Sequence, residues 1–326
     1  MKSFEQVLNT VNDSTFADIA LRLFYEQAAR NEVYKDFLGF LGVDPASIKQ
    51  VDDIPYLPIT FFKSHLVATG DWPHPETIFS SSGTSGSATS KHIVPQLAIY
   101  LENARRNFES FYGPLTDYNI LALLPSYLER EGSSLVSMVN YFIQKSESPH
   151  GGFYLKDYEG LLRKIKDIED HSRHVILIGV SFALLELAEK NEVDLSNCLI
   201  METGGMKGRR KEIIREELHE FLRNRFKANT IHSEYGMTEL MSQAYSAGNG
   251  LYKPPSWMKV FVRDIHDPFK MEETGKTGGI NIIDLANWHS CAFIETQDLG
   301  KVHQNGYFEV LGRFDNSDIR GCNLLV

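Results

Sequence analysis

The chain has 326 residues, 42% of them hydrophobic and 23% charged, which is the composition of an ordinary soluble globular protein with material for a large core. Its formal net charge of −10 argues against a broad nucleic-acid surface, because such binding depends on Lys and Arg side chains that neutralise phosphates. No run approaches about 18 apolar residues and the N-terminus lacks an apolar signal stretch, so we expect no membrane span and a cytoplasmic protein.

The N-terminal part of the chain predicts helices and one irregular loop. Apolar side chains recur three and four residues apart over 16–24, after the candidate cap Ser14, and the first 50 residues read as helical. A run of small residues from 80 to 90 is unsuited to regular structure, and helix-like sequence resumes at 97–111.

Farther along, apolar runs alternate with amphipathic ones. We expect buried strands at 119–124, 175–180, 198–201 and 228–232, and helices at 182–191 and 211–226. This alternation indicates βαβ units and a mostly parallel sheet. From residue 258 onward, short strands at 260–262, 280–283 and 308–310 predict an antiparallel or barrel-like subdomain.

The small-residue loop, residues 80–91, is the first segment with candidate chemistry. Its glycines allow close backbone approach, its hydroxyls donate hydrogen bonds and its lysine adds charge, which together suit a polyphosphate. The candidate phosphate-binding residues are Ser81, Ser82, Gly83, Thr84, Ser85, Gly86 and Lys91. The loop is not a Walker A motif, because no Gly-Lys-Ser/Thr closes it. A flexible Gly/Ser linker is the alternative that the loop alone leaves open.

A second candidate segment, residues 232–239, follows the strand predicted at 228–232. Ligands of open α/β sheets bind beyond the carboxyl ends of strands, so a polar turn containing Gly236 is well placed. Here Tyr235 is suited to stack on a base, Thr238 to bond a phosphate oxygen and Glu239 to hold Mg²⁺. The alternative is an ordinary strand-to-helix turn with Thr238 or Glu239 as a cap.

These two segments, in this order, resemble two core motifs of the adenylate-forming superfamily. Gln297-Asp298-Leu299-Gly300 resembles the superfamily's aspartate motif, whose carboxylate binds the ribose hydroxyls. Gly312-Arg313-Phe314-Asp315 resembles its Gly-Arg-x-Asp hinge, whose arginine contacts the nucleotide. Gly204 and Gly205 stand where the superfamily has an adenine-contacting glycine turn.

The resemblance implies an α/β fold of the adenylate-forming N-terminal type, with mostly parallel sheets flanked by helices and a smaller β-rich subdomain. We expect an adenylation core over residues 1–257, a β-rich subdomain of the same core over 258–312 and a hinge-like tail over 313–326. The large C-terminal lid of most members, with its catalytic lysine, is expected to be absent because the chain stops at Val326.

The segments 124–130 and 320–325 narrow the resemblance to the LuxE-type acyl-protein synthetases. In that family a cysteine near the C-terminus is the acyl acceptor, and Cys322 matches it in position and context. A neighbouring cation lowers a cysteine pKa, so Arg320 would favour the thiolate. The alternative for Cys322 is an incidental free thiol, and we expect Cys198 and Cys291 to be structural.

The implied function is ATP- and Mg²⁺-dependent activation of a carboxylic acid, a fatty acid by resemblance, as acyl-AMP. Transfer to Cys322 and then to a partner protein, an acyl reductase or an acyl carrier, would follow. Two alternatives stay open: an acyl- or aryl-CoA ligase related to phenylacetate-CoA ligase, and a non-catalytic domain that binds a nucleotide or acyl ligand. His232 and His289 are candidate bases without a visible acidic partner.

Overall fold

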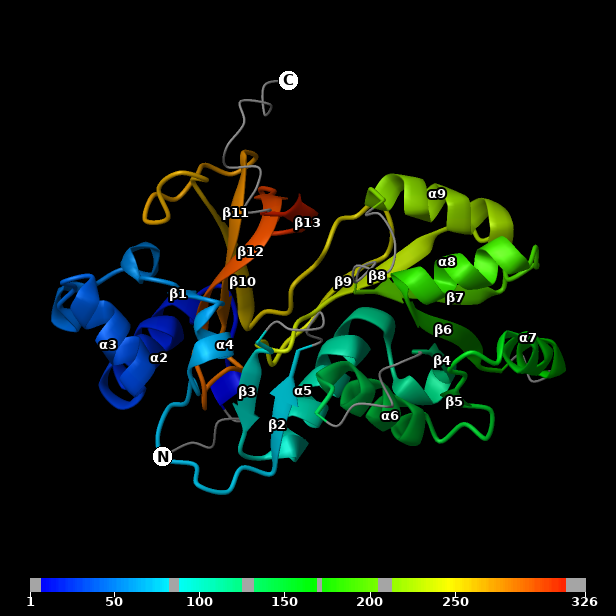
Figure 1. Cartoon of the computed structure of the whole chain (residues 1–326), viewed down its shortest axis with the longest axis horizontal. Helices are drawn as coiled ribbons and strands as arrows, with labels where there is room; N and C mark the ends of the chain where they lie inside the picture. Colours follow the sequence, from blue (N-terminus) through cyan, green and yellow to red (C-terminus); the bar gives the residue numbers. More distant parts are fainter. Residues whose placement is uncertain (1–6, 82–87, 125–131, 169–171, 205–212, 315–326) are drawn as a thin grey trace.

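The computed structural model describes residues 7–81, 88–124, 132–168, 172–204 and 213–314. In Figure 1 a mostly parallel sheet with helices on both faces lies beside a second sheet that packs against the N-terminal helices. Among the helices within these stretches, none is long and apolar enough to cross a membrane.

The larger sheet has six strands in the order β5-β4-β6-β7-β8-β9. Its strands are β4 (Tyr118–Leu123), β5 (Gly152–Phe153), β6 (His174–Val180), β7 (Cys198–Thr203), β8 (Ile231–Tyr235) and β9 (Ala244–Ser246). All neighbouring pairs are parallel except β8 and β9, so the predicted mostly parallel sheet is confirmed. The strand predicted at 228–232 begins three residues later, because the preceding helix ends in a left-handed residue, Lys227, and residues 228–230 turn the chain.

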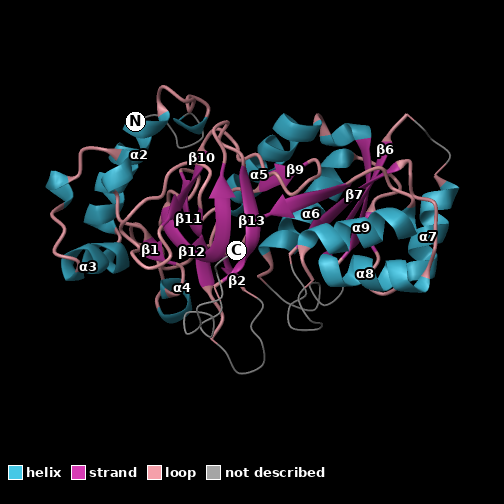
Figure 2. Cartoon of the chain, turned by 90° about the horizontal axis from the view of Figure 1, so that it is seen from above, coloured by secondary structure: helices cyan, strands magenta, loops and turns pink. Residues whose placement is uncertain are grey.

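Helices cover both faces of this sheet, as Figures 1 and 2 show. On one face lie α5 (Leu97–Tyr112) and α6 (Ser134–Ser146), and on the other lie α8 (Ser181–Lys190) and α9 (Arg215–Phe226). A further helix, α7 (Tyr158–Asp167), lies near the β4–β5 edge. The helices predicted at 97–111 and 182–191 are confirmed to within about a residue, because both carry the expected apolar face.

The second sheet is antiparallel apart from one short strand. It contains β1 (Leu57–Pro58), β10 (Met258–Arg263), β11 (Thr277–Asp284), β12 (Phe293–Val302) and β13 (Phe308–Arg313). The β-rich subdomain expected after residue 258 is confirmed, and β1 joins it in parallel with β12. The division of the chain at residue 257 stays a prediction.

Two N-terminal helices, α2 (Phe16–Arg30) and α3 (Glu32–Phe40), pack against this sheet. The rings of Phe24 and Tyr34 lie 6.0 and 6.1 Å from the ring of Phe293. Ser14 was predicted as the helix cap, but Thr15 occupies that position without a side-chain cap bond. Instead the side chain of Asn12 accepts hydrogen bonds from the backbone amides of both residues, at 2.9 and 3.2 Å.

The small-residue loop closes a hairpin between β2 (Thr77–Ser80) and β3 (Lys91–Val94). Its two ends are joined, because Ser81 N donates to Ser90 O at 3.1 Å and Ser90 N donates to Ser81 Oγ at 2.9 Å. The alternative of a flexible Gly/Ser linker concerns mainly residues 82–87, which lie outside the described residues. The remaining short helices are α4 (Phe61–Ser64), η1 (Pro45–Ser47), η2 (Val51–Asp53) and η3 (Leu115–Asp117).

Candidate active site

Three residues predicted separately from the sequence meet where the two sheets face each other. Tyr235 ends β8, Asp298 lies within β12, and Arg313 ends β13 directly opposite Asp298. The Tyr235 hydroxyl donates to Asp298 Oδ2 at 2.7 Å, and Arg313 Nε lies 3.3 Å from Asp298 Oδ1. One buried carboxyl group therefore joins both sheets.

Burial and pairing shift the pKa of the Asp298 carboxyl group in opposite directions. Burial raises the pKa of Asp298 above its ordinary value, while Arg313 and the bond from Tyr235 lower it. Burial also raises the pKa of Tyr235 well above its usual range, so this hydroxyl is a neutral donor. The Arg313 side chain is 72% exposed, so its attraction to Asp298 is screened by solvent and the guanidinium is accessible to a ligand.

Glu239 lies in the turn after β8 and is the second buried carboxyl group of the site. Its residue is 5% exposed, and burial raises its pKa. A hydrogen bond with Ser90 and the nearby charges of Arg313 and Lys63 oppose that shift. The carboxyl group therefore faces the base of the small-residue loop and two cations, of which Lys63 on α4 was missed from the sequence.

The backbone beside Glu239 is fixed by two buried side chains that sequence reasoning also missed. His92 Nδ1 lies 2.8 Å from the Thr238 carbonyl oxygen, and its Nε2 lies 2.9 Å from Asn287 Oδ1. Asn287 Nδ2 in turn donates to the Glu239 carbonyl oxygen at 2.7 Å. Two facing oxygens would favour a charged ring, but burial outweighs them and lowers the pKa of His92 to about 4. The His92 ring and the Asn287 amide thus hold the Thr238–Glu239 turn.

Asp284, at the end of β11, anchors the segment that follows Glu239. Its carboxylate accepts hydrogen bonds from Met241 N at 2.8 Å and from the amide and hydroxyl of Ser242 at 2.9 and 2.7 Å. Ala286 N donates to the same carboxylate at 3.1 Å. Burial nevertheless raises the pKa of Asp284 to about 6, and the bonds to it partly offset this effect.

Two glycines of the predicted site occupy positions where a side chain would be crowded or strained. A β-carbon at Gly236 would lie 2.4 Å from Glu234 Oε1, closer than atoms can approach. Gly204, directly after β7, has φ of 68°, a left-handed conformation that glycine adopts at little cost. Its carbonyl oxygen accepts a bond from the Ser181 hydroxyl at 3.0 Å. Of the loop residues, Lys91 begins β3 as an exposed side chain opposite Ser80.

Several predicted site residues lie outside the described residues: Ser82, Gly83, Thr84, Ser85, Gly86, Gly205 and Cys322. Within the described stretches, no group of three or more His, Cys, Asp or Glu side chains is arranged to hold a metal ion.

The two candidate histidine bases make contacts that suit packing. His232 Nδ1 lies 3.1 Å from the Tyr112 hydroxyl, and burial lowers the pKa of His232 to about 4. The His289 ring packs edge-on against Trp72, with ring centres 4.9 Å apart, and burial lowers its pKa as well. Neither contact places a candidate base beside Glu239.

The two described cysteines have the weakly reactive thiols expected of structural residues. Burial raises the pKa of Cys198 to about 11 and that of Cys291 to about 12. Cys291 is fully buried, whereas Cys198, expected inside the core, is half-buried at the start of β7. Because the thiolate is the nucleophile, neither is suited to accept an acyl group near neutral pH.

No model of a known protein family matches the chain. It is 24% identical over 326 residues to the long-chain-fatty-acid–luciferin-component ligase of Vibrio harveyi, an alignment that covers 90% of this chain and 82% of the relative.

Solved structures of ligases show the same fold. The match to 2-hydroxyisobutyryl-CoA ligase in complex with 2-HIB-AMP and CoA has a TM-score of 0.69 and 13% identity, and covers 97% of this chain and 70% of that one. ATP-bound MatB from Rhodopseudomonas palustris matches with a TM-score of 0.54 and 17% identity over 75% of this chain. The chain spans about half the length of that structure, 49%.

Both sets of matches bear out the predicted α/β fold, and their names agree with the predicted enzyme class, a ligase. The chain therefore has the fold of the adenylate-forming ligases and resembles, over most of its length, the LuxE-type ligases that its sequence motifs indicated.

Proposed function

We propose that this protein uses ATP to activate a carboxylic acid as an acyl adenylate and then transfers the acyl group to Cys322. The observation that carries the proposal is the meeting of Tyr235, Asp298 and Arg313 beside the buried Glu239. These residues come from three separate segments, since Tyr235 and Glu239 share the segment 232–239, and each matches a nucleotide-binding or catalytic position of the adenylate-forming superfamily.

The nucleotide would lie across the edges of the two sheets. The small-residue loop, with Lys91, holds the β- and γ-phosphates, while the adenine lies against Tyr235, Gly236 and the Gly204–Gly205 turn. Asp298 binds the ribose hydroxyls and Arg313 contacts the nucleotide. The exposed guanidinium of Arg313 supports this role, because it can turn from Asp298 to a ligand with little desolvation cost.

In the first step a carboxylate oxygen of the acid bonds to the α-phosphorus, and the bond to the departing pyrophosphate breaks. Thr238 positions the α-phosphate, and the cations Lys63 and Arg313 near Glu239 offset the charge that develops there. Mg²⁺ commonly binds through one or two carboxylates plus substrate phosphates, so the single buried Glu239 fits it without a larger acidic cluster. When bound, Mg²⁺ would neutralise charge on the phosphates.

In the second step the Cys322 thiolate attacks the acyl carbon and AMP leaves, which produces a thioester on the enzyme. The acyl group then passes to a partner protein, an acyl reductase or an acyl carrier. The fatty nature of the acid is supported by the name of the Vibrio harveyi relative. A cytoplasmic location belongs to the same proposal.

Transfer to CoA is a second candidate for the acceptor step. It is favoured by the match to a ligase solved with both 2-HIB-AMP and CoA, which covers 97% of this chain. In that case Cys322 would be dispensable.

The identity of the acyl acceptor is tested by intact-protein mass spectrometry after incubation with ATP, Mg²⁺ and a panel of fatty and aromatic acids. We expect an acyl adduct on Cys322 that Cys322→Ser abolishes, while acid-dependent ATP–pyrophosphate exchange continues. Cys198→Ser is the matched control and should keep the adduct, because its thiol has a raised pKa. In a parallel incubation with added CoA, acyl-CoA formation that is unchanged in Cys322→Ser would replace the enzyme cysteine with CoA as acceptor.

A further inference from the structure

Four buried polar side chains gather between β8, β9 and α5, on a part of the site that the nucleotide proposal does not use. Glu234 on β8 stands directly opposite Tyr245 on β9, so their side chains lie on the same face of the sheet. Gln243 precedes Tyr245 by two residues, and Asn103 on α5 donates to Met241 O at 2.7 Å. All four residues are buried: Glu234 is 7% exposed, Tyr245 is 1% exposed, and Gln243 and Asn103 are each 3% exposed.

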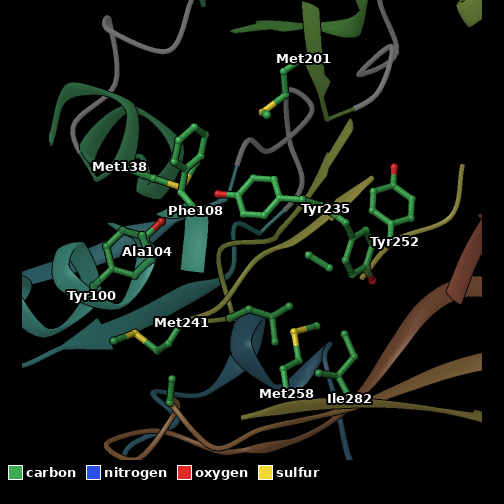
Figure 3. Close-up of a cluster of buried hydrophobic side chains, with 14 of the residues drawn as sticks. Tyr100, Ala104, Phe108, Met138, Met201, Tyr235, Met241, Tyr252, Met258 and Ile282 are labelled. Carbon is green, nitrogen blue, oxygen red and sulfur yellow. The ribbon is translucent and has the colours of Figure 1, made fainter. Parts of the chain in front are cut away.

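The cluster lies within a largely aromatic environment. The Tyr245 ring centre is 5.9 Å from Phe108, 5.9 Å from Phe111 and 5.5 Å from Tyr112. Figure 3 shows the neighbouring buried hydrophobic side chains, with Tyr100, Ala104 and Phe108 of α5 on one side and Tyr235 and Tyr252 on the other. Apolar walls around a few polar atoms are typical of sites for small organic ligands.

Three atoms of the cluster lack a hydrogen-bond partner among the residues that the structure describes. They are the Tyr245 hydroxyl oxygen, Gln243 Oε1 and Asn103 Oδ1, all of them buried. Buried polar atoms normally have a partner, and leaving one without costs stability. Their concentration in one place therefore points to a ligand group that completes them.

The cluster lies close in the chain to Thr238, the residue proposed to position the α-phosphate. Glu234 and Gln243 converge on Gly236, since a β-carbon there would lie 2.4 Å from Glu234 Oε1 and 3.4 Å from Gln243 Cγ. Gly236 precedes Thr238 by two residues, and two residues span at most about 7 Å of extended chain. In the proposed adenylation, a ligand group held at the cluster would therefore lie near the carboxylate that is activated beside Thr238.

The cluster can both donate and accept hydrogen bonds. The Tyr245 hydroxyl is a donor, and Gln243 Oε1 is an acceptor. Burial raises the pKa of Glu234 to about 7, and the neighbouring charge of Glu202 adds to this effect, although a bond from the Thr203 hydroxyl opposes it. Near neutral pH the Glu234 carboxyl group is thus partly protonated. An anionic group would be repelled by this cluster, whereas a hydroxyl group matches it.

We propose that the acid activated by this protein carries a hydroxyl group near its carboxylate, which binds among Glu234, Gln243 and Tyr245. This inference rests on the proposed adenylation. A plain alkyl segment at the same place would leave the buried polar atoms without partners. Sites built to bond a substrate hydroxyl discriminate strongly against the analogue that lacks it.

The test compares matched pairs of acids, such as 3-hydroxydecanoate with decanoate and 2-hydroxyhexanoate with hexanoate, in acid-dependent ATP–pyrophosphate exchange. For at least one pair we expect kcat/KM to favour the hydroxy acid by at least about tenfold. Tyr245→Phe should bring that ratio close to one without lowering folding stability, because its hydroxyl has no partner among the described residues. Tyr118→Phe is the matched control: its hydroxyl donates to Tyr112 O at 2.6 Å, so it should lose stability but keep the ratio.

A second readout, thermal unfolding with each acid but without ATP, separates the two proposals. Exchange at equal rates for both members of every pair, or an unchanged ratio in Tyr245→Phe, would overturn the hydroxyl site while leaving adenylation standing. Stabilisation by the hydroxy acid alone, lost in Tyr245→Phe, together with no exchange by any acid, would support the hydroxyl site and refute adenylation. Neither stabilisation nor exchange with any acid would overturn both.

Discussion

At the scale of single residues, the two carboxyl groups Glu239 and Glu234 are close in sequence but have different surroundings. Glu239 is flanked by the cations Lys63 and Arg313, whose charges favour its ionised form. Glu234 is flanked by Glu202, and burial keeps it partly protonated near neutral pH. Environment rather than residue type thus gives these groups distinct proposed roles.

We expect Glu239→Gln to lower acid-dependent ATP–pyrophosphate exchange by about 100-fold or more, because it removes the carboxylate proposed to hold Mg²⁺ and align the phosphates. Its folding stability should not fall, since burial disfavours the charge that the substitution removes. Exchange rates and urea unfolding of the same preparations measure both effects. Glu273→Gln is the control, because that side chain is 85% exposed and should change neither. Full exchange by Glu239→Gln would remove this residue from the mechanism.

The raised pKa of Glu234 leads to a prediction that can be tested without an enzyme assay. Its folded-state pKa of about 7 exceeds the ordinary value of 4.5, so the folded protein binds the proton more tightly. The folding stability that Glu234 contributes is therefore fully present below about pH 4.5 and is lost as the pH rises through about 7. Relative to Glu234→Gln, the wild type should lose about 3 kcal/mol of unfolding free energy between pH 4.5 and 8. Urea unfolding at both pH values measures the difference, and a pH-independent gap between the two proteins would contradict it.

At the scale of secondary-structure elements, apolar periodicity predicted most of the larger sheet. All six residues of β4 are buried, and five of the seven in β6, so their sequences are nearly continuous apolar runs. By contrast β12, the longest strand, was missed although it carries Asp298. Buried and partly buried positions alternate along this strand, but the buried ones include Thr296, Asp298 and Gly300. The sequence therefore lacks the alternation of apolar and polar side chains that predicts a strand.

The contact of Asn287 with the Thr238–Glu239 turn can be tested against an equally buried asparagine. Asn287→Ala leaves the Glu239 carbonyl oxygen and one His92 nitrogen without their partner, at a cost of about 1–3 kcal/mol. Asn281→Ala should cost a similar amount, because Asn281 in β11 is one of the acceptors of the buried Arg263 guanidinium.

Only the first substitution should lower exchange, since only Asn287 touches the turn that carries Glu239. Chemical unfolding together with exchange kinetics separates stability from activity. Equal loss of exchange in both variants would mean that Asn287 acts through general stability alone.

At the scale of the whole molecule, the sequence identified several residues of the site but not their arrangement. Tyr235, Asp298 and Arg313 could be chosen because each lies in a short pattern of chemically distinctive residues. That they share one carboxyl group depends on how two sheets face each other, which no local pattern specifies.

Lys63, His92 and Asn287 were missed for a related reason. Each stands alone in its segment, and a lone lysine, histidine or asparagine has no spacing that marks it. They reach Glu239 through α4, β3 and the loop after β11, which are brought together only by tertiary packing.

The most direct test of the account is ATP–pyrophosphate exchange by the wild type and Asp298→Asn with the same panel of acids. Asparagine keeps the shape of the side chain but removes the charge that faces Arg313 and, in the proposal, the ribose. We expect exchange that requires an acid in the wild type, and a kcat/KM for ATP that is at least about tenfold lower in the variant. Absence of exchange with every acid, or equal exchange by the two proteins, would contradict it.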